Sequence, residues 1–383
     1  MIVGSMRVGE KEGRMNRRST ARAFCIALLV LVLVVGSSFA EEREGIYVEF
    51  DPRIIGADVR LGYRVPLLSQ RLTAVSAMVG GAWGGEAYYR FPDDSLYPPG
   101  APYEAATFNR VNLIWDVGVE QDLSANPSNL VSPFVFYRGI RNVPLDDVEE
   151  DELFLSSPRS DAAGILTNEL LVGAYVDAVR ENDTFATQTG FYGEASAAIA
   201  PRAFANDVVG DSDYTRMNLT LKGFLPLAEV GSHEDPILGA YLAGFLSVDR
   251  VLGSATPHYV RSTFGGLDPR WGLGGAVRGV GSQRFDSSFK AVANFEARLA
   301  FPGFLDPWIV PGIVTYVDAG YYLDTEELAP DSEGIAVTSG LGLSVDALGI
   351  ATLVFYTQYY LNGNTVRRDS PWTPFALGFG LHF

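Results

Sequence analysis

The chain has 383 residues, a formal net charge of −17 at pH 7 and 47% hydrophobic residues. Such an acidic chain disfavours nucleic acid as a partner, because the phosphate backbone repels it. Cys25 is the only cysteine, which excludes disulfides and thiolate metal sites from the chain downstream of it. We expect no metal and no cofactor.

The first 40 residues have the three parts of a secretory signal peptide. Basic residues up to Arg22 precede an apolar run over 24–35, and small residues ending at Ala40 suit a signal peptidase. The apolar run is shorter than the roughly 20 residues of a membrane-spanning helix. We therefore predict a signal peptide over 1–40, cleaved before Glu41.

Downstream of this leader, apolar and polar residues alternate, and helical periodicity is almost absent. In 213–227, for example, Leu219 and Leu221 alternate with Asn218 and Lys222. A period of two is that of a β-strand with one apolar and one polar face. This segment exceeds the ~9–11 residues with which a tilted strand crosses a bilayer. Fourteen such segments are predicted, over 45–51, 54–66, 71–91, 107–122, 129–142, 164–181, 189–203, 213–227, 236–251, 287–301, 308–323, 334–346, 350–362 and 372–383.

The connections between these segments alternate in length. The one at 66–70 is short, whereas those at 91–106 and 142–161 are long and polar or rich in proline. Outer-membrane barrels have short turns at one end and long loops at the other. We therefore predict an all-β fold, a transmembrane antiparallel β-barrel of 14–16 strands over 41–383 with a long loop folded inward. The larger count applies if the segment at 71–91 is divided.

The last predicted strand ends the chain on an aromatic residue. Phe375, Leu377, Phe379, Leu381 and Phe383 alternate there with Ala376, Gly378, Gly380 and His382. A final amphipathic strand with an aromatic carboxy terminus resembles the signal that the barrel-assembly machinery of Gram-negative-type bacteria reads. We therefore predict a bacterial outer-membrane location, with this machinery and the outer-membrane lipids as partners.

A glycine-rich stretch from Gly265 leads into the strand over 287–301. It carries Arg278, and the next two strands present Glu296 and Asp318 on their polar faces. The planar guanidinium of arginine can hold two carboxylates by charge-assisted hydrogen bonds. We predict that this loop lies in the barrel lumen, held by the two acids. The site comprises Gly274, Gly275, Val277, Arg278 and Gly279 in the loop, the carboxylates Glu296 and Asp318, and the turn glycine Gly320.

These residues resemble the barrel of the bacterial surface-antigen superfamily, which includes outer-membrane assembly insertases and two-partner-secretion transporters. The resemblance implies that the Val-Arg-Gly loop folds back into the barrel and that its arginine contacts acidic residues on the next two strands. Five strands follow the loop in that superfamily, and five are predicted here. Insertases and secretion pores of the superfamily also carry periplasmic polypeptide-transport-associated domains. Only a few residues separate the predicted leader from the first strand, so we expect a barrel-only relative.

The resemblance implies a role in outer-membrane protein insertion or translocation, with a periplasmic or membrane helper protein as a further partner. Two alternatives stay open. One is a passive or gated pore for small solutes, and the other is a structural or adhesive surface antigen. The sequence contains no Gly-x-Ser-x-Gly elbow, P-loop, His-Glu-x-x-His or dinucleotide fingerprint, so we do not expect an enzyme.

Overall fold

The protein is described from a computed structural model. The structure describes residues 45–53, 56–68, 71–87, 107–124, 130–145, 164–267, 277–278, 287–302, 309–323, 334–347, 351–361 and 372–381. These residues belong to one compact unit, Glu44–Phe383. The signal peptide predicted over 1–40 lies outside the described residues.

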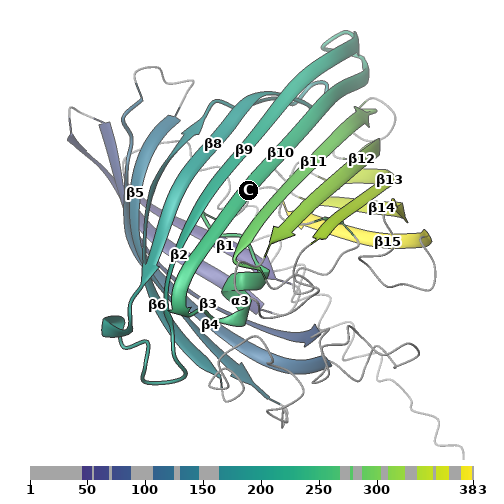
Figure 1. The fold of residues 1–383 in the computed structure, drawn as a ribbon. Helices are drawn as coiled ribbons and strands as arrows, with labels where there is room; N and C mark the ends of the chain where they lie inside the picture. Colours follow the sequence, from purple (N-terminus) through teal and green to yellow (C-terminus); the bar gives the residue numbers. More distant parts are fainter. Residues whose placement is uncertain are drawn as a thin grey trace, which may run out of the picture. The chain divides into compact units, whose positions relative to one another are not determined.

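In the described residues, the segments in which apolar and polar residues alternate form fourteen principal strands, and each pairs antiparallel with the next (Figure 1). A short strand, β7, lies off this path and pairs with β8. No helix in the described part of the chain has the length and hydropathy to span a membrane. The strands are β1 (Gly45–Arg53), β2 (Gly56–Leu68), β3 (Arg71–Ala87), β4 (Thr107–Gln121), β5 (Leu130–Pro144), β6 (Ile165–Asp177), β7 (Arg180–Asn182), β8 (Thr187–Ala200), β9 (Asp213–Gly231), β10 (Pro236–Ala255), β11 (Phe289–Ala300), β12 (Ile309–Leu323), β13 (Gly334–Ala347), β14 (Ala351–Tyr360) and β15 (Trp372–Leu381).

The predicted all-β fold is confirmed, and so are its fourteen principal strands. The segment predicted over 71–91 is not divided among the described residues, where β3 is one strand, so the lower end of the predicted range of 14–16 applies there. The segment predicted over 164–181 is shorter than expected, because β6 ends at Asp177 and residues 180–182 form β7 in a hairpin with β8. Five strands, β11 to β15, follow the glycine-rich loop, as predicted.

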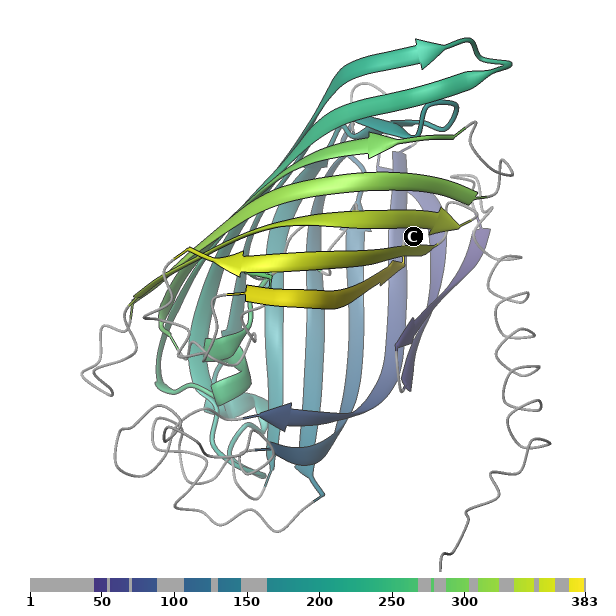
Figure 2. The same cartoon turned by 90° about the vertical axis from the view of Figure 1, so that its right-hand side faces the viewer.

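The sheet curls round into the wall of a barrel (Figure 2). β1 and β15 are the two ends of the hydrogen-bonded path, and among the described residues no pairing joins them. Because consecutive antiparallel strands reverse direction, the start of β1 and the end of β15 lie at the same end of the wall. The end of β2 and the start of β3 lie at that end too, whereas the end of β10 and the start of β11 lie at the opposite end.

The two faces of the wall have opposite chemistry. On β11 the side chains of Lys290 and Glu296 are buried, while Phe295 between them is 52% exposed. On β12 Val317 is 47% exposed, and its neighbour Asp318 is fully buried. A water-soluble barrel would instead bury its apolar face. An apolar outer face around a polar interior is the pattern of a transmembrane barrel.

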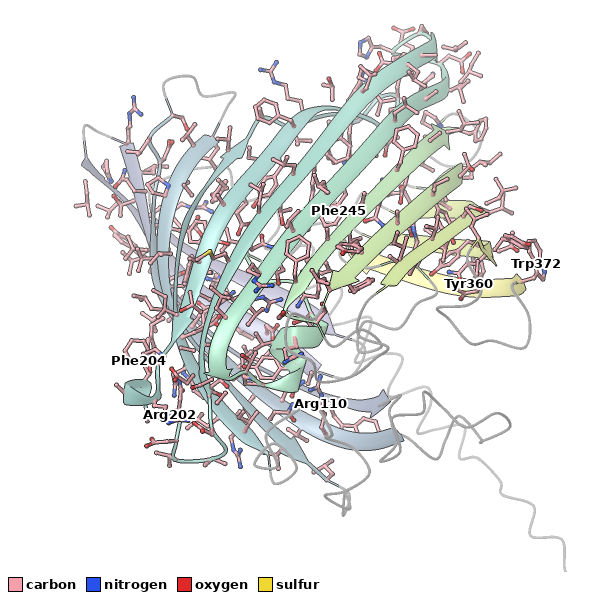
Figure 3. The ribbon with its side chains drawn as sticks, in the orientation of Figure 1. Arg110, Arg202, Phe204, Phe245, Tyr360 and Trp372 are labelled. Atoms are coloured by element: carbon pink, nitrogen blue, oxygen red, sulfur yellow. The ribbon has the colours of Figure 1, made fainter. Side chains whose placement is uncertain are left out.

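Apolar and aromatic side chains also occupy part of the interior. One buried cluster contains Phe245 and Tyr360, which Figure 3 labels, together with Val277 of the glycine-rich loop. A second cluster surrounds Phe134 of β5, and Leu267 packs against it. The described parts of the connection between β10 and β11 therefore pack against the inside of the wall.

Candidate functional site

Two carboxylates lie on the inner face of adjacent strands. β11 and β12 pair with Glu296 opposite Tyr316 and with Asn294 opposite Asp318. The two-residue period of each strand directs both acidic side chains inward. Their exposed fractions are 4% for Glu296 and 0% for Asp318. Carboxylates buried this deeply need a cation or several hydrogen-bond donors.

Arg278 supplies both a cation and the donors. Its backbone N–H and its Nε donate to Oδ2 of Asp318, at 2.9 and 2.7 Å, and its Nη2 donates to Oδ1 at 2.7 Å. Its Nη1 donates to Oε1 of Glu296 at 2.5 Å. The guanidinium carbon also lies 3.6 Å from the centre of the Tyr316 ring, in cation–π contact. One loop residue therefore bridges two strands of the wall.

A second arginine, Arg298 of β11, completes the charge balance. Its Nε donates to Oε2 of Glu296 at 2.5 Å, and its Nη1 donates to the hydroxyl of Tyr241 at 3.2 Å. Two guanidinium groups thus face two carboxylates. Burial by itself lowers the pKa of Arg278, but the hydrogen bond to Asp318 and the charge of Glu296 outweigh it and raise that pKa. The guanidinium therefore keeps its charge inside the barrel.

Gly320 corrects the sequence-based assignment of a turn glycine. It lies within β12, three residues before the strand ends at Leu323, and its position is buried. A Cβ atom placed on Gly320 would lie 2.7 Å from Cε2 of Tyr322 and 2.7 Å from Cγ2 of Val277, which is itself only 1% exposed. The glycine is needed because the Tyr322 ring and the loop both approach the strand closely there, and not because the backbone turns.

Some of the predicted site residues lie outside the residues that the structure describes. Gly274, Gly275, Gly279 and Phe383 are not among the described residues. The other residues of the predicted assembly signal lie in β15, which pairs with β14 as an antiparallel strand, but their side chains are not described. These residues are Phe375, Leu377, Phe379 and Leu381.

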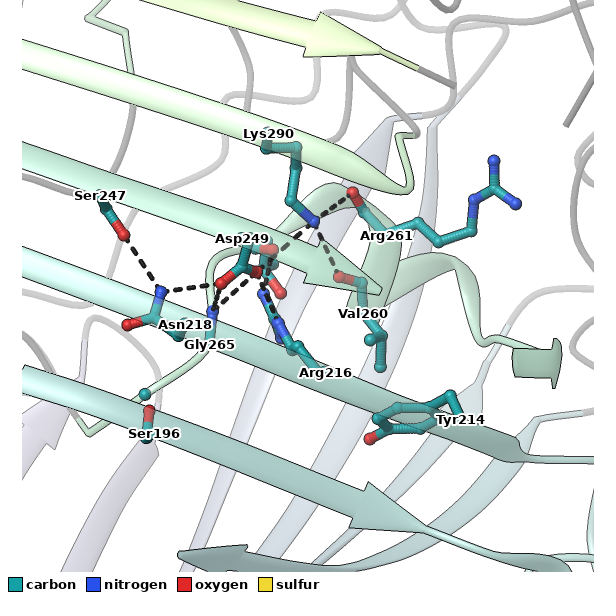
Figure 4. A network of polar contacts seen from close by, with 12 residues as sticks. Ser196, Tyr214, Arg216, Asn218, Ser247, Asp249, Val260, Arg261, Gly265 and Lys290 are labelled. Atoms are coloured by element: carbon teal, nitrogen blue, oxygen red, sulfur yellow. Dashed lines mark hydrogen bonds and ion pairs between the residues drawn. The ribbon is translucent and has the colours of Figure 1, made fainter. Parts of the chain in front are cut away.

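Charged residues of the barrel wall also contact residues 257–267 (Figure 4). The sequence did not identify these wall residues as a site. They include Arg216, Asp249 and Lys290, on β9, β10 and β11. The available signal was their position on the polar faces of alternating strands. Within the described ranges, no group of His, Cys, Asp and Glu side chains is arranged to hold a metal ion.

No protein-family model and no curated protein matches the sequence. Among solved structures, the chain is similar to the crystal structure of BamA from Haemophilus ducreyi lacking POTRA domains 1-3. The TM-score is 0.52, with 12% sequence identity over 88% of this chain and 64% of that one. The chain is also similar to CdiB from Escherichia coli, with a TM-score of 0.48 and 14% identity over 85% of this chain and 52% of that one.

The likeness to BamA is one of fold. It defines the class of protein as a transmembrane antiparallel β-barrel. The chain spans less than two thirds of the length of that BamA structure, 64% of it.

Proposed function

We propose that this chain is an outer-membrane β-barrel of the surface-antigen superfamily that takes part in protein insertion or translocation. The observation that carries the proposal is the contact of Arg278 with both Glu296 and Asp318, in a barrel with the fold of BamA. Arg278 thus joins the glycine-rich loop to two adjacent strands of the wall.

The apolar outer face supports a membrane location. Exposed large side chains on the strands include Leu61, Val79, Val117, Leu219 and Leu343. Because these residues point away from the polar interior, water would solvate them poorly and lipid would solvate them well. The location in the bacterial outer membrane further rests on the predicted signal peptide and the final strand.

The packing of the loop favours a closed barrel over a passive pore. Val277 joins the buried cluster around Phe245, and Phe264 packs against the same cluster. Leu267 packs against the cluster around Phe134. Apolar side chains of the described parts of the loop therefore occupy space inside the wall that an open pore would leave to water. We therefore propose that conduction or translocation requires the loop to move.

The proposed partners follow from the role proposed for the barrel in the outer membrane. Outer-membrane lipids would surround the apolar face, and the barrel-assembly machinery would recognise the carboxy-terminal strand. A periplasmic or membrane helper protein would deliver a polypeptide to the barrel. Co-purification from native membranes, with Arg278→Ala as a matched variant, tests the presence of such a helper.

Depletion of the chain tests the proposal directly. We expect the levels of other outer-membrane barrels, or of a secreted protein, to fall, and expression of the wild-type chain to restore them. Planar-bilayer recording discriminates the alternatives. A large steady conductance of the wild-type chain, together with unchanged barrel levels on depletion, would favour the solute pore. A silent barrel with no depletion phenotype would favour a structural or adhesive surface antigen.

A further inference from the structure

The connection between β10 and β11 meets the inner wall a second time, well before Arg278. The chain leaves β10 at Ala255, forms the short helix α3 (His258–Ser262) and continues to Leu267. We call residues 257–267 the proximal segment. Figure 4 shows its contacts with inward-facing side chains of β9, β10 and β11.

Asp249 of β10 is at the centre of these contacts, and it is fully buried. Its neighbours across the sheet are Asn218 on β9 and Lys290 on β11. Its carboxylate accepts hydrogen bonds from Nε of Arg216 at 2.6 Å and from Nδ2 of Asn218 at 2.7 Å. It also accepts the backbone N–H of Gly265, at 3.1 Å to Oδ2. The carboxylate of Asp249 is therefore a buried hydrogen-bond acceptor for the backbone of the proximal segment.

The cations around Asp249 bind the carbonyl groups of the same segment. The ammonium of Lys290 lies 3.7 Å from Oδ2 of Asp249 and donates to the carbonyl oxygens of Val260 and Arg261, at 3.1 and 2.7 Å. A second cation, Arg216, donates through Nη2 to the carbonyl oxygen of Thr263. Lys290 and Arg216 thus each contact both the carboxylate of Asp249 and a backbone carbonyl group of the proximal segment.

Two more wall residues continue this pattern at the end of the segment. Glu194 of β8 accepts the backbone N–H of Leu267 at 2.9 Å. Arg138 of β5 donates to the carbonyl oxygen of Gly266 at 3.0 Å. All of these wall contacts reach backbone atoms. The hydrogen bonds are made to peptide groups, and the site fits glycine at 265 and 266, because a Cβ there would lie 2.7 Å from Nε of Arg216 and 2.6 Å from Oε1 of Glu194.

We propose that the inner wall of β8–β11 carries a polypeptide-backbone binding site, centred on Asp249, that holds the proximal segment independently of the Arg278 contacts. The charges of this site are separate from those around Arg278. β10 and β11 contribute to both sites, and Val277 and Phe264 pack against one buried cluster. The hydrogen bonds of the proximal segment do not involve Arg278, so release of Arg278 leaves them in place. The proposal concerns the loop and the wall, so it stands whether the barrel handles polypeptides or solutes.

Cysteine labelling of the full chain in detergent micelles tests this independence, with Cys25→Ser removing the native thiol. Leu267→Cys reports on the proximal segment and Val277→Cys on the arginine motif. We expect Asp249→Asn to accelerate maleimide labelling at position 267 about tenfold or more, which corresponds to ~1.4 kcal/mol of opening free energy. We expect Arg278→Ala to accelerate labelling at position 277 and to leave position 267 unchanged.

Lys290→Met removes the two carbonyl contacts while Arg216 still pairs with Asp249, so it provides a milder second variant if Asp249→Asn does not fold. Asp116→Asn is the control for loss of a buried wall carboxylate, since Asp116 pairs with Arg60 at 2.9 Å. It should change neither rate. If Arg278→Ala exposes position 267 as strongly as Asp249→Asn does, the two sites are one and the proposal is overturned. Unchanged labelling at position 267 in folded Asp249→Asn and Lys290→Met would overturn it too.

Discussion

Asp249 and Asp318 lie on β10 and β12, on either side of β11, and each accepts a backbone N–H from the same connection. The distances are 3.1 Å from Gly265 to Asp249 and 2.9 Å from Arg278 to Asp318. An arginine Nε binds each carboxylate as well, at 2.6 and 2.7 Å. The difference is the origin of that arginine. Arg216 belongs to the wall, whereas Arg278 belongs to the loop, so only the Asp318 site loses its cation when the loop leaves.

This difference predicts that Arg278→Ala leaves the buried Asp318 without its cation, whereas Glu296 keeps Arg298. Removal of one partner of a buried ion pair costs ~3–5 kcal/mol, and the cost should be lower here because the Arg278 side chain is 23% exposed. We expect a lower temperature for the heat-induced shift in gel mobility and a higher single-channel conductance. Arg278→Lys keeps the positive charge but lacks the planar guanidinium. Its mobility-shift temperature and conductance should lie between those of the wild type and Arg278→Ala. Wild-type folding and conductance in Arg278→Ala would argue against the contact.

The two carboxylates should contribute unequally. Asp318 accepts three hydrogen bonds from Arg278, whereas Glu296 accepts one and shares its charge with Arg298. We expect Asp318→Asn to accelerate maleimide labelling of Val277→Cys by about tenfold or more, and Glu296→Gln to accelerate it less. The reverse order would show that Glu296 is the principal anchor.

A side chain at position 320 should destabilise the barrel as long as Val277 packs against β12. A Cβ on Gly320 would lie 2.7 Å from both Val277 and Tyr322, so Gly320→Val must displace the loop or the Tyr322 ring, or distort β12. We expect a destabilisation of ~1–3 kcal/mol, as for overpacked cores, measured by urea unfolding in lipid vesicles. Gly244→Val is the matched control, because a Cβ at Gly244 of β10 meets no atom within 4 Å. Equal losses in both variants would contradict the close approach.

The outer face should reject charge if lipid surrounds it. Val317 is 47% exposed on the outer face of β12. A cationic residue near the middle of a membrane costs ~2–4 kcal/mol on the lipid face of a barrel, so Val317→Arg should lower the free energy of unfolding by about that amount in vesicles. Glu234→Arg, at an exposed position in the β9–β10 turn, is the control and should have little effect. A neutral Val317→Arg would indicate that water covers this face.

Strand positions were predictable because two-residue alternation is written directly into the sequence. On β11, for instance, Lys290 and Glu296 fall on the polar positions of an otherwise apolar pattern, and both are buried. The Arg278 contacts were predictable too, since a motif and two nearby strands carry them. The short β7 hairpin was not, because three residues are too few to show a period.

The contacts of Asp249 could not be predicted from the sequence. They join β10 to backbone groups of the proximal segment, and no side-chain pattern marks a backbone partner. They also depend on the register that places Asp249 between Asn218 and Lys290. The role of Gly320 was misassigned for a related reason, since only the packed structure shows that Val277 fills the space beside it.

A cysteine pair at positions 277 and 320 tests most directly whether the loop lies inside the barrel. Cγ2 of Val277 and a Cβ on Gly320 are 2.7 Å apart, so Val277→Cys and Gly320→Cys together place a sulfur within reach of a disulfide. Val277→Cys with Gly244→Cys on β10 is the matched pair. With Cys25→Ser in both, we expect mild oxidation in native membranes to form the 277–320 disulfide and not the 277–244 one, read by mass spectrometry. Free thiols at position 277 in the folded first pair, or efficient cross-linking in the second, would contradict a loop held against β12.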